Sequence, residues 1–389
     1  MTLRLYYTDS YLRDFDAAVV DRADGGRRVY LDRTAFYPTS GGQPHDTGTL
    51  GGAAVVDTVD EGDRIAHLLA DPIDGTTVHG GVDWPRRFDH MQQHTGQHLL
   101  SAVLHHLFGH GTIAVHFGRE SSTLDLDTPD LDQARLLEVE GRANEIVTEN
   151  RPVEVSFEEA MEATGLRKAS AREGTLRIVT IRDLDRSACG GTHVRATGEI
   201  GPILIRRSER VKKNVRLEFV CGGRATRRAR ADLDLLARLA GSFSAAADKL
   251  PALVEAQRAE LKAAAGARRE LEESLARYRA RELYDTAPDG SPRRIVVREE
   301  KGPIDRLRPL AQAIAAMPRA LFVGWTAEPP AIVVATSADS GVDAGAALRS
   351  ALEAVGGRGG GNPRLAQGTA GSPAAAERVV TALLGAVNR

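Results

Sequence analysis

The sequence has few cysteines, few aromatic residues and no long apolar run. Only two of its 389 residues are cysteines, Cys189 and Cys221, so no framework of disulfides is expected to hold the fold together. Aromatic residues make up 5% of the chain. No apolar stretch approaches the roughly 20 residues that a membrane-spanning helix needs, and the N-terminal segment carries acids where a signal peptide has an apolar core. We therefore expect a cytoplasmic protein with no membrane partner.

The chain also lacks a strong net charge, which is −2. Hydrophobic residues (42%) and charged residues (27%) are in the usual range for globular proteins. No global positive field therefore indicates a nucleic-acid partner, although one segment is locally basic. On charge alone, that segment is best interpreted as the solvated face of a strand pair. Its six basic residues are Arg206, Arg207, Arg210, Lys212, Lys213 and Arg216.

The first half of the chain predicts two domains. Residues 1–85 alternate short apolar runs with Gly, Asp and Pro clusters, which favours a small β-barrel. Residues 86–223 mix helical and strand patterns, which indicates an α+β domain. In this domain we expect helices over 89–108 and 131–150, the second capped by Thr128 with Pro129 in its first turn. The expected strands are 153–157, 176–181, 202–205 and 215–221.

The second half predicts a helical spacer followed by another domain. Residues 224–285 are rich in Ala, Leu, Arg and Glu, and a heptad-like stripe with Gln257 and Arg268 as polar interruptions runs from Leu250 to Tyr278. Residues 286–389 alternate strand and helix patterns, typical of a compact α/β domain. The strands are expected at 295–297, 320–324 and 331–335, and the helices at 304–315, 343–355 and 374–387. The fold class is thus a multidomain α+β protein, and either the spacer or the last domain could mediate homodimerisation.

The strongest local signal is a run of histidines four residues apart, His90, His94 and His98. On a helix such residues share a face, so two imidazoles one turn apart can bind one metal ion. The outer two are two turns apart and cannot easily do so together. The spacing therefore leaves two alternatives for the chelating pair, His90 with His94 or His94 with His98.

A second signal is the segment Cys189-Gly-Gly-Thr-His193. The paired glycines argue against a helix, so this is expected to be a loop that directs a thiolate and an imidazole to one point. Cysteine and histidine are preferred zinc ligands, and the two segments together supply a tetrahedral set. Metalloproteases place glutamate directly after the first histidine, whereas Thr95 follows His94 here. Cys221 is interpreted as a core residue at the end of a strand.

Four segments resemble those of a known family. They are Phe36–Pro44 (FYPTSGGQP), Met91–Leu100 (MQQHTGQHLL), Cys189–Val194 with Thr197–Gly201, and Gly359–Gly368 (GGGNPRLAQG). The first three are similar to the alanyl-tRNA editing proteins of the AlaX family in its long form, which resemble the editing half of alanyl-tRNA synthetase. The fourth resembles the signature of the C-terminal DHHA1 domain, with Asn362 where arginine is common.

The resemblance implies roles for particular residues. His94, His98, Cys189 and His193 match the zinc ligands of the family, which would settle the helix alternatives against His90. Thr39 matches a threonine that senses the hydroxyl of misplaced serine, and Gln43 lies in the same loop, facing the site. The basic segment from Arg206 to Arg216 becomes a candidate tRNA contact. The DHHA1-like domain would hold the tRNA body or mediate self-association.

The activity implied is hydrolysis of the aminoacyl ester of mischarged tRNA(Ala), chiefly seryl-tRNA(Ala), with the glycyl form as a second candidate. The alternative is a tRNA-binding module with a purely structural zinc. A DHH phosphodiesterase is disfavoured because Phe88-Asp-His-Met91 breaks the Asp-His-His pattern. A full synthetase is not expected, because no aminoacylation domain precedes the barrel. The glycines at 356–361 match neither a P-loop nor a dinucleotide fingerprint, so no nucleotide site is expected there.

Overall fold

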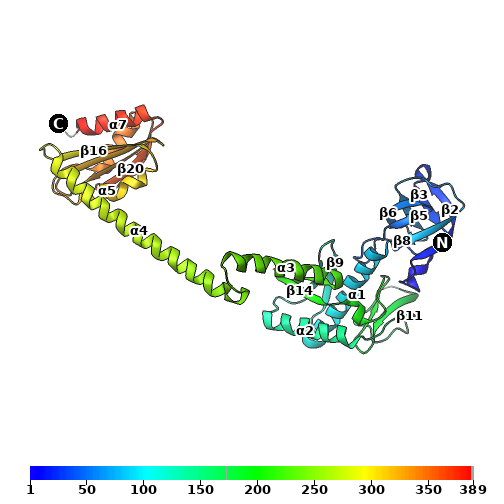
Figure 1. Cartoon of the computed structure of the whole chain (residues 1–389). Helices are drawn as coiled ribbons and strands as arrows, with labels where there is room; N and C mark the ends of the chain where they lie inside the picture. The colour runs from blue at the N-terminus through cyan, green and yellow to red at the C-terminus, as the bar shows by residue number, and fades with distance from the viewer. Residues whose placement is uncertain (172, 387–389) are drawn as a thin grey trace. The chain divides into compact units, whose positions relative to one another are not determined.

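The computed structural model describes residues 1–171 and 173–386, and they form two compact units, Met1–Leu239 and Ala240–Arg389 (Figure 1). Each unit has its own hydrophobic core. Among the described residues, no helix is both long and apolar enough to cross a membrane. The mixed α/β, multidomain character predicted from the sequence is confirmed.

Unit 1 begins with a closed six-stranded barrel, as predicted, in the order β2-β3-β7-β6-β5-β8. In β2, Phe15 and Ala17 are buried while their neighbours are exposed, which is the alternation expected when one strand face lines a core. The short strands β1 (Leu3–Arg4) and β4 (Arg33–Thr34) pair beside the barrel. The barrel strands are β2 (Asp14–Ala23), β3 (Arg28–Leu31), β5 (Gly48–Leu50), β6 (Ala53–Asp60), β7 (Ile65–Leu69) and β8 (Thr77–Val82).

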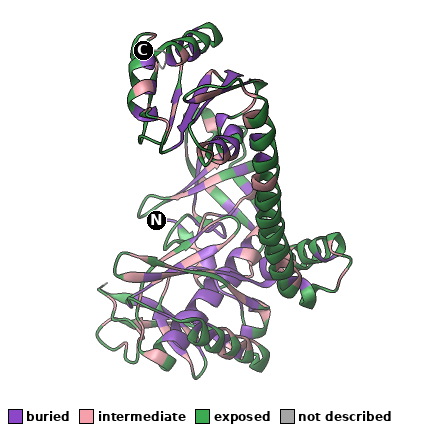
Figure 2. Cartoon of the chain, turned by 90° about the vertical axis from the view of Figure 1, so that its left-hand side faces the viewer, coloured by how far each residue is buried: buried purple, intermediate pink, exposed green. Residues whose placement is uncertain are grey.

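Helix α1 (Trp84–Phe108) follows the barrel and is buried over most of its length (Figure 2). It starts five residues before the predicted position 89. Pro85, the last residue of the segment predicted as a β-barrel, occupies the first helical turn, where a proline removes no helical hydrogen bond. The side chain of Asp83 caps the helix by accepting a hydrogen bond from the backbone N–H of Arg86.

Two antiparallel sheets and a second helix, α2 (Gln133–Glu149), complete the α+β part of unit 1. The predicted cap of α2 is wrong. Asp132 accepts the bond from the N–H of Arg135, whereas the hydroxyl of Thr128 donates to the carbonyl of Asp130. One sheet has the order β14-β15-β10-β9 and the other β11-β12-β13. Their strands are β9 (Thr112–Phe117), β10 (Ser122–Leu126), β11 (Val153–Glu159), β12 (Thr175–Ile181), β13 (Asp185–Ala188), β14 (Ile203–Val211) and β15 (Asn214–Cys221).

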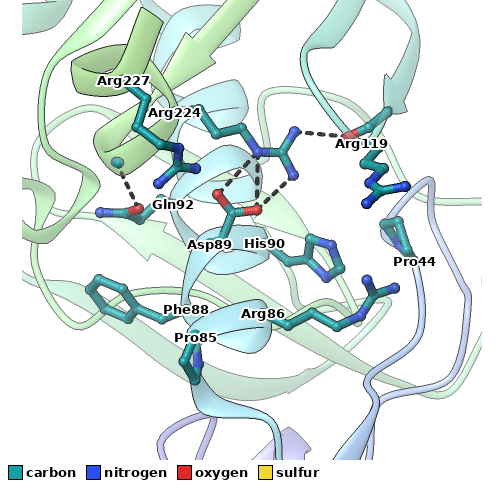
Figure 3. A pocket seen from close by; sticks show the side chains of 12 residues that line it. Pro44, Pro85, Arg86, Phe88, Asp89, His90, Gln92, Arg119, Arg224 and Arg227 are labelled. Carbon is teal, nitrogen blue, oxygen red and sulfur yellow. Dashed lines mark hydrogen bonds and ion pairs between the residues drawn. The ribbon is translucent and has the colours of Figure 1, made fainter. Parts of the chain in front are cut away.

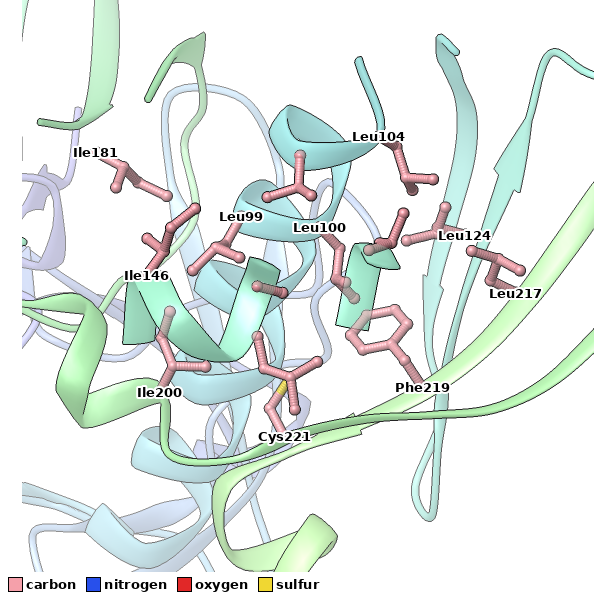
Figure 4. Packing of buried hydrophobic residues seen from close by; sticks show 14 of the residues in the cluster. Leu99, Leu100, Leu104, Leu124, Ile146, Ile181, Ile200, Leu217, Phe219 and Cys221 are labelled. Atoms are coloured by element: carbon pink, nitrogen blue, oxygen red, sulfur yellow. The ribbon is translucent and has the colours of Figure 1, made fainter. Parts of the chain in front are cut away.

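The core of this part forms between α1 and its neighbours. Leu99, Leu100 and Leu104 of α1 meet Leu124 of β10 and Phe219 of β15 (Figure 4). All five are fully or almost fully buried. This packing fixes α1 at the centre of unit 1, so its polar side chains have defined positions.

Cys221 lies in the same core, at the end of β15, as predicted, and its sulfur lies against Gly96 of α1. A Cβ added at Gly96 would lie 2.3 Å from the Cys221 sulfur. We therefore expect Gly96→Ala to lower the free energy of unfolding by about 1–3 kcal/mol, although alanine favours a helix intrinsically. The measurement is chemical denaturation, with Gly96→Ala/Cys221→Ala as the comparison. The explanation fails if the double variant is no more stable than the single one.

The predicted spacer, residues 224–285, is divided between the units. Helix α3 (Gly222–Ser242) belongs mainly to unit 1, whereas α4 (Leu250–Thr286) belongs to unit 2. Most of α4 is exposed (Figure 2). On its heptad-like stripe, Leu261, Leu271 and Leu275 are 65–71% exposed. Homodimerisation along this stripe stays a prediction.

Unit 2 contains a five-stranded sheet in the order β16-β17-β18-β20-β19. Its predicted strands and helices are all present, and the glycine-rich segment 359–368 forms the hairpin β19–β20, which the sequence reasoning did not predict as strands. Asn362 accepts hydrogen bonds at the turn of this hairpin from the N–H groups of Arg364 and Leu365. The elements are β16 (Arg293–Lys301), α5 (Arg308–Ala315), β17 (Ala320–Glu328), β18 (Ala331–Thr336), α6 (Ala344–Glu353), β19 (Arg358–Gly361), β20 (Leu365–Thr369) and α7 (Pro373–Ala386).

Candidate metal centre and substrate cavity

Four metal-binding side chains from two separate segments meet in unit 1. His94 and His98 lie one turn apart on α1, Cys189 follows β13, and His193 lies in the loop beyond it. One ligand atom from each of the four lies within 4.8 Å of the others. The Cys189 sulfur is 3.4 Å from Nε2 of His94 and 3.3 Å from Nε2 of His193. The three histidines are buried and the cysteine is half-buried.

The loop that carries Cys189 is held by a buried arginine. Arg177 of β12 donates from Nη1 to the carbonyls of Cys189 (2.7 Å) and Gly191 (2.9 Å), and from Nε to the carbonyl of Tyr7. A Cβ added at Gly191 would lie 2.2 Å from the His94 ring, so only glycine lets the loop approach the helix this closely. Gly191 thus allows the predicted loop to pack against α1.

Each imidazole of the cluster is oriented by a hydrogen bond at its Nδ1 atom, and the partner of His94 is Gln43. Nδ1 of His94 lies 2.8 Å from the side-chain oxygen of Gln43. That oxygen also accepts from the N–H of Thr192, and the Gln43 amide nitrogen donates to the Thr192 hydroxyl at 2.7 Å. Gln43 faces the cluster, as expected. However, its amide is fully engaged by protein groups and does not line the cavity, so its contacts are those of a positioning residue.

The other two imidazoles have equivalent partners. Nδ1 of His98 lies 3.1 Å from Asp185, whose carboxylate is also bound by Arg167 at 2.7 Å. Nδ1 of His193 lies 3.1 Å from the hydroxyl of Thr95. Because an amide oxygen and a carboxylate only accept, Nδ1 of His94 and His98 donates to its partner, and Nε2 of each ring is the atom directed at the cluster.

The donor set fits a zinc ion. One thiolate and three imidazoles combine the soft and borderline ligands that zinc prefers. With ordinary Zn–S and Zn–N bond lengths, a tetrahedral site places sulfur and nitrogen about 3.6 Å apart. The 3.3 and 3.4 Å separations at Cys189 are close to that value. The outer hydrogen bonds at Nδ1 are those that metal-binding histidines usually make.

The ionisation of Cys189 suits a cation, whereas His98 must lose a proton to bind one. Burial tends to raise the pKa of the Cys189 thiol, but the neighbouring His94 and His193 lower it well below its usual value. Burial, together with the charge of His94, lowers the pKa of His193 to about 3. Burial opposes the charged form of His98 as well, yet the hydrogen bond to Asp185 raises its pKa to about 9. A cation at this point therefore meets a thiolate, the form in which cysteine binds metals.

The structure brings His94 and His98 to the cluster, and not His90. His90 is buried one turn earlier and lines a different pocket, considered below. Two other histidines near the resembling segments also lie outside the cluster. His45 contacts Asp57 at 3.1 Å, and His116 is exposed.

A cavity of about 780 Å³ opens beside the cluster. Its wall includes residues of the segment 37–41, of β9 and of the loop after β11. Thr39 is exposed, and its hydroxyl contacts the backbone N–H and Nδ1 of His45, at 3.1 and 3.2 Å. Its neighbours Pro38 and Ser40 line the cavity, but Thr39 does not, so its contact with a substrate stays a prediction.

The basic segment forms the hairpin of β14 and β15. Two of its charges already have acidic partners, since Arg216 binds Asp125 through two hydrogen bonds and Arg207 lies 3.2 Å from Glu209. The remaining four basic side chains, Arg206, Arg210, Lys212 and Lys213, are exposed. A tRNA contact at this hairpin stays a prediction.

Sequence reasoning missed the residues that hold the ligands in place. Thr95 and Thr192 lie inside the two motifs. A histidine that binds a metal through one ring nitrogen usually makes a hydrogen bond through the other, so a search for hydrogen-bonding residues within the motifs could have indicated these two threonines. Asp185 and Arg177 had no such local signal, because neither belongs to a spaced motif. They join the site only through the pairing of β12 with β13.

Asp185 offers a direct test of this outer layer. We expect Asp185→Asn to weaken zinc binding by about 10–100-fold. A neutral amide orients the His98 ring less firmly than a carboxylate does, and it makes Nε2 of that ring a weaker base. The measurement is competition for zinc against a chelator of known affinity. Asp183→Asn, an exposed position nearby, is the control and should bind as the original protein does. Equal affinity in both variants would contradict the role given to Asp185.

The geometry defines a cluster of four side chains that could hold a metal ion beside a cavity, and comparisons with known proteins name the class of the chain. Residues 176–217, which include Cys189 and His193, match the model of the threonyl and alanyl tRNA synthetase second additional domain. The chain is 38% identical over 243 residues to the alanyl-tRNA editing protein AlaX-M of Methanosarcina acetivorans, covering 56% of this chain and 98% of that protein. It is 36% identical to AlaX-L of Pyrococcus horikoshii, covering 66% of each chain.

The chain belongs to the AlaX family of alanyl-tRNA editing proteins. It is also 35% identical over 335 residues to the alanine–tRNA ligase of Pyrococcus furiosus, covering 80% of this chain. It spans only 36% of that ligase, and 43% of the ligase of Thermococcus kodakarensis.

Proposed function

We propose that this protein is a hydrolase that cleaves the ester between a wrongly attached amino acid and tRNA(Ala). The observation that carries the proposal is the cluster of His94, His98, Cys189 and His193 at the wall of a cavity. The relatives named as alanyl-tRNA editing proteins support the choice of substrate.

The four clustered residues would hold a zinc ion. When bound there, zinc supplies a Lewis acid that polarises an ester carbonyl or lowers the pKa of water. His94, His98 and Cys189 line the cavity, so three of the four proposed ligands face the space for the substrate. Gln43, Asp185 and Thr95 keep the three Nε2 atoms directed at one point and so fix the position of the ion.

The buried surroundings also exclude bulk water from the cluster. The ring of Phe117 packs against His94, with 5.0 Å between ring centroids, and the buried Arg177 donates to the carbonyl of Cys189. Polar groups beside the buried cluster therefore act more strongly than they would in solvent.

The expected substrate preference follows from the limited selectivity of a synthetase pocket that is built for alanine. A pocket for alanine rejects serine poorly, by on the order of 100-fold, because serine only adds a hydroxyl. A second site that hydrogen-bonds that hydroxyl discriminates better, since alanine would leave the bonding group unpaired. We propose Thr39 for this contact, which requires its hydroxyl to leave His45 and turn toward the cavity. Seryl-tRNA(Ala) is then the main substrate, with glycyl-tRNA(Ala) second.

Binding of the tRNA would use further surfaces. The exposed basic side chains of the β14–β15 hairpin are suited to contact phosphates. Unit 2, the predicted DHHA1-like domain, would hold the tRNA body or mediate self-association.

The deciding experiment is hydrolysis of purified seryl-, glycyl- and alanyl-tRNA(Ala) by the zinc-loaded protein. We expect rapid loss of serine and sparing of alanine. Cys189→Ala should abolish cleavage, whereas His116→Ala, which removes an exposed histidine outside the cluster, should not. Equal cleavage of serine and alanine would remove the role given to Thr39. No cleavage by a folded, zinc-loaded protein would favour the alternative, a tRNA-binding module with a structural metal.

A further inference from the structure

A second pocket, of about 580 Å³, lies in unit 1 beside the first two turns of α1 (Figure 3). It shares no lining residue with the cavity at the metal cluster. Its wall combines the start of α1, the start of α3, Pro44, and Gly118 and Arg119 after β9. Neither the metal cluster nor its outer hydrogen bonds use any of these side chains.

The pocket carries an excess of positive charge. Among the described residues, Arg119 and Arg227 have no hydrogen-bond or ion-pair partner, and Arg86 contacts only the carbonyl of His45. The one acidic group in the wall, Asp89, is already neutralised, because Arg224 binds it through Nε at 3.0 Å and Nη2 at 2.6 Å. Three guanidinium groups therefore face a space that contains no free anion of the protein.

A buried group in the wall also lacks a partner. His90 is 5% exposed and lines the pocket, and its Nδ1 atom is buried without a hydrogen bond in the described structure. An unpaired buried nitrogen of this kind is unfavourable. Burial lowers the pKa of His90 to about 4, so the ring is neutral. His90 therefore adds an uncharged polar ring to the wall of the pocket.

One side of the pocket is apolar. Phe88 and Pro85 form this side, Pro44 lies across the pocket from them (Figure 3), and Phe88 is only partly buried. A planar ring beside unpaired arginines is the combination on which proteins bind single-stranded nucleic acid, with bases stacked on the ring and phosphates bound by the cations. A free inorganic anion would use the arginines but not the ring.

From this combination we infer that the pocket holds the single-stranded 3′ end of the tRNA, with a backbone phosphate at Arg119 and Arg227 and a base against Phe88. The inference rests on the proposed function, because it gives the aminoacylated strand its path to the metal cluster. His90 and His94 are four residues apart on α1, so the pocket lies about 6 Å along the helix from the first metal-binding side chain.

The wall between the two spaces is thin. The loop that carries Gln43 packs on β9, and a Cβ added at Gly42 would lie 3.1 Å from the Val115 carbonyl and 3.5 Å from the Phe117 ring. Val115 lines the metal cavity and Gly118 lines the arginine pocket, three residues further along the chain. The arginine pocket and the metal cavity are therefore separated only by this contact between the loop and β9, which the bound strand would pass around.

The test measures binding of uncharged RNA, so it does not depend on catalysis. The probes are an acceptor-stem hairpin with the tRNA(Ala) 3′ end and the same hairpin without its single-stranded nucleotides. Arg119→Ala/Arg227→Ala should weaken binding of the complete hairpin about tenfold and reduce the slope of log K against log salt concentration by about 1. The control Arg230→Ala/Arg238→Ala changes two exposed arginines of α3 outside the pocket and should leave both values unchanged.

The truncated hairpin decides whether the contact is to the 3′ end. We expect the original protein and the double variant to bind it equally. An equal loss with both hairpins would overturn the inference, because the arginines would then contact the stem. The inference would also be overturned if the double variant bound RNA as the original protein does while only the original protein bound inorganic phosphate. The pocket would then be a simple anion site. If the original protein binds RNA through these arginines but cleaves no ester, the proposed function fails and this contact stands.

Discussion

Replacing Cys189 by serine is expected to remove bound zinc and to reduce deacylation of seryl-tRNA(Ala) by at least about 100-fold. Loss of an outer partner of a ligand already costs about 10–100-fold in affinity or activity, and loss of the ligand itself costs more. Serine keeps the size of the side chain but its hydroxyl stays protonated, whereas the pKa of Cys189 lies well below the usual thiol value. Zinc content measured by mass spectrometry, beside the cleavage rate, checks both parts.

The control separates metal loss from unfolding. Cys221→Ser changes the other cysteine, which lies in the core and outside the cluster, so that variant should retain zinc even if it is less stable. Treatment of the original protein with a chelator should reproduce the effect of Cys189→Ser. Added zinc should restore activity to the chelator-treated protein but not to the Cys189→Ser variant. A Cys189→Ser protein that keeps one zinc per chain and full activity would show that the thiolate is not a ligand.

The second large effect concerns stability. Arg87→Met is expected to lower the free energy of unfolding of unit 1 by about 3–5 kcal/mol, because it leaves the carboxylate of Asp46 buried without its counter-ion. Both side chains are fully buried. Nε of Arg87 lies 2.9 Å from each oxygen of Asp46, and Nη1 donates to the carbonyl of Ser10. The pair joins α1 to the loop that carries Gln43.

Denaturant-dependent hydrogen exchange in peptides of α1 measures this loss separately from unit 2. Arg86→Met, at the adjacent and only partly buried position, should cost far less. Replacing both partners, Arg87→Met/Asp46→Leu, should recover part of the stability, since two apolar side chains leave no buried charge. If the double variant is less stable than Arg87→Met, unpaired charge is not the cause.

Much of the fold could be predicted because its signals are local. The alternation within residues 1–85 predicts the barrel, and the helical and strand patterns of unit 2 place nearly all its elements. The errors occurred where a local signal has two interpretations. Pro85 can end a segment or begin a helix, and Asp83, one residue before α1, decides which. Thr128 and Asp132 can both cap a helix, and only Asp132 immediately precedes the first turn of α2.

The sequence by itself determined the chemistry of the site. Histidines four apart on one helix face a common side whatever the rest of the fold, and the Cys-Gly-Gly-Thr-His segment can only be a loop. The tertiary structure decided which histidines are used and what surrounds them. Asp185 reaches His98 across 87 residues, and Gln43 reaches His94 across 51, through the packing of α1 against other segments. The periodicity of a sequence indicates only which residues are neighbours within one helix or strand. Contacts between distant segments depend on how the elements pack, and so does the position of Arg119 and Arg227 in the wall of one pocket.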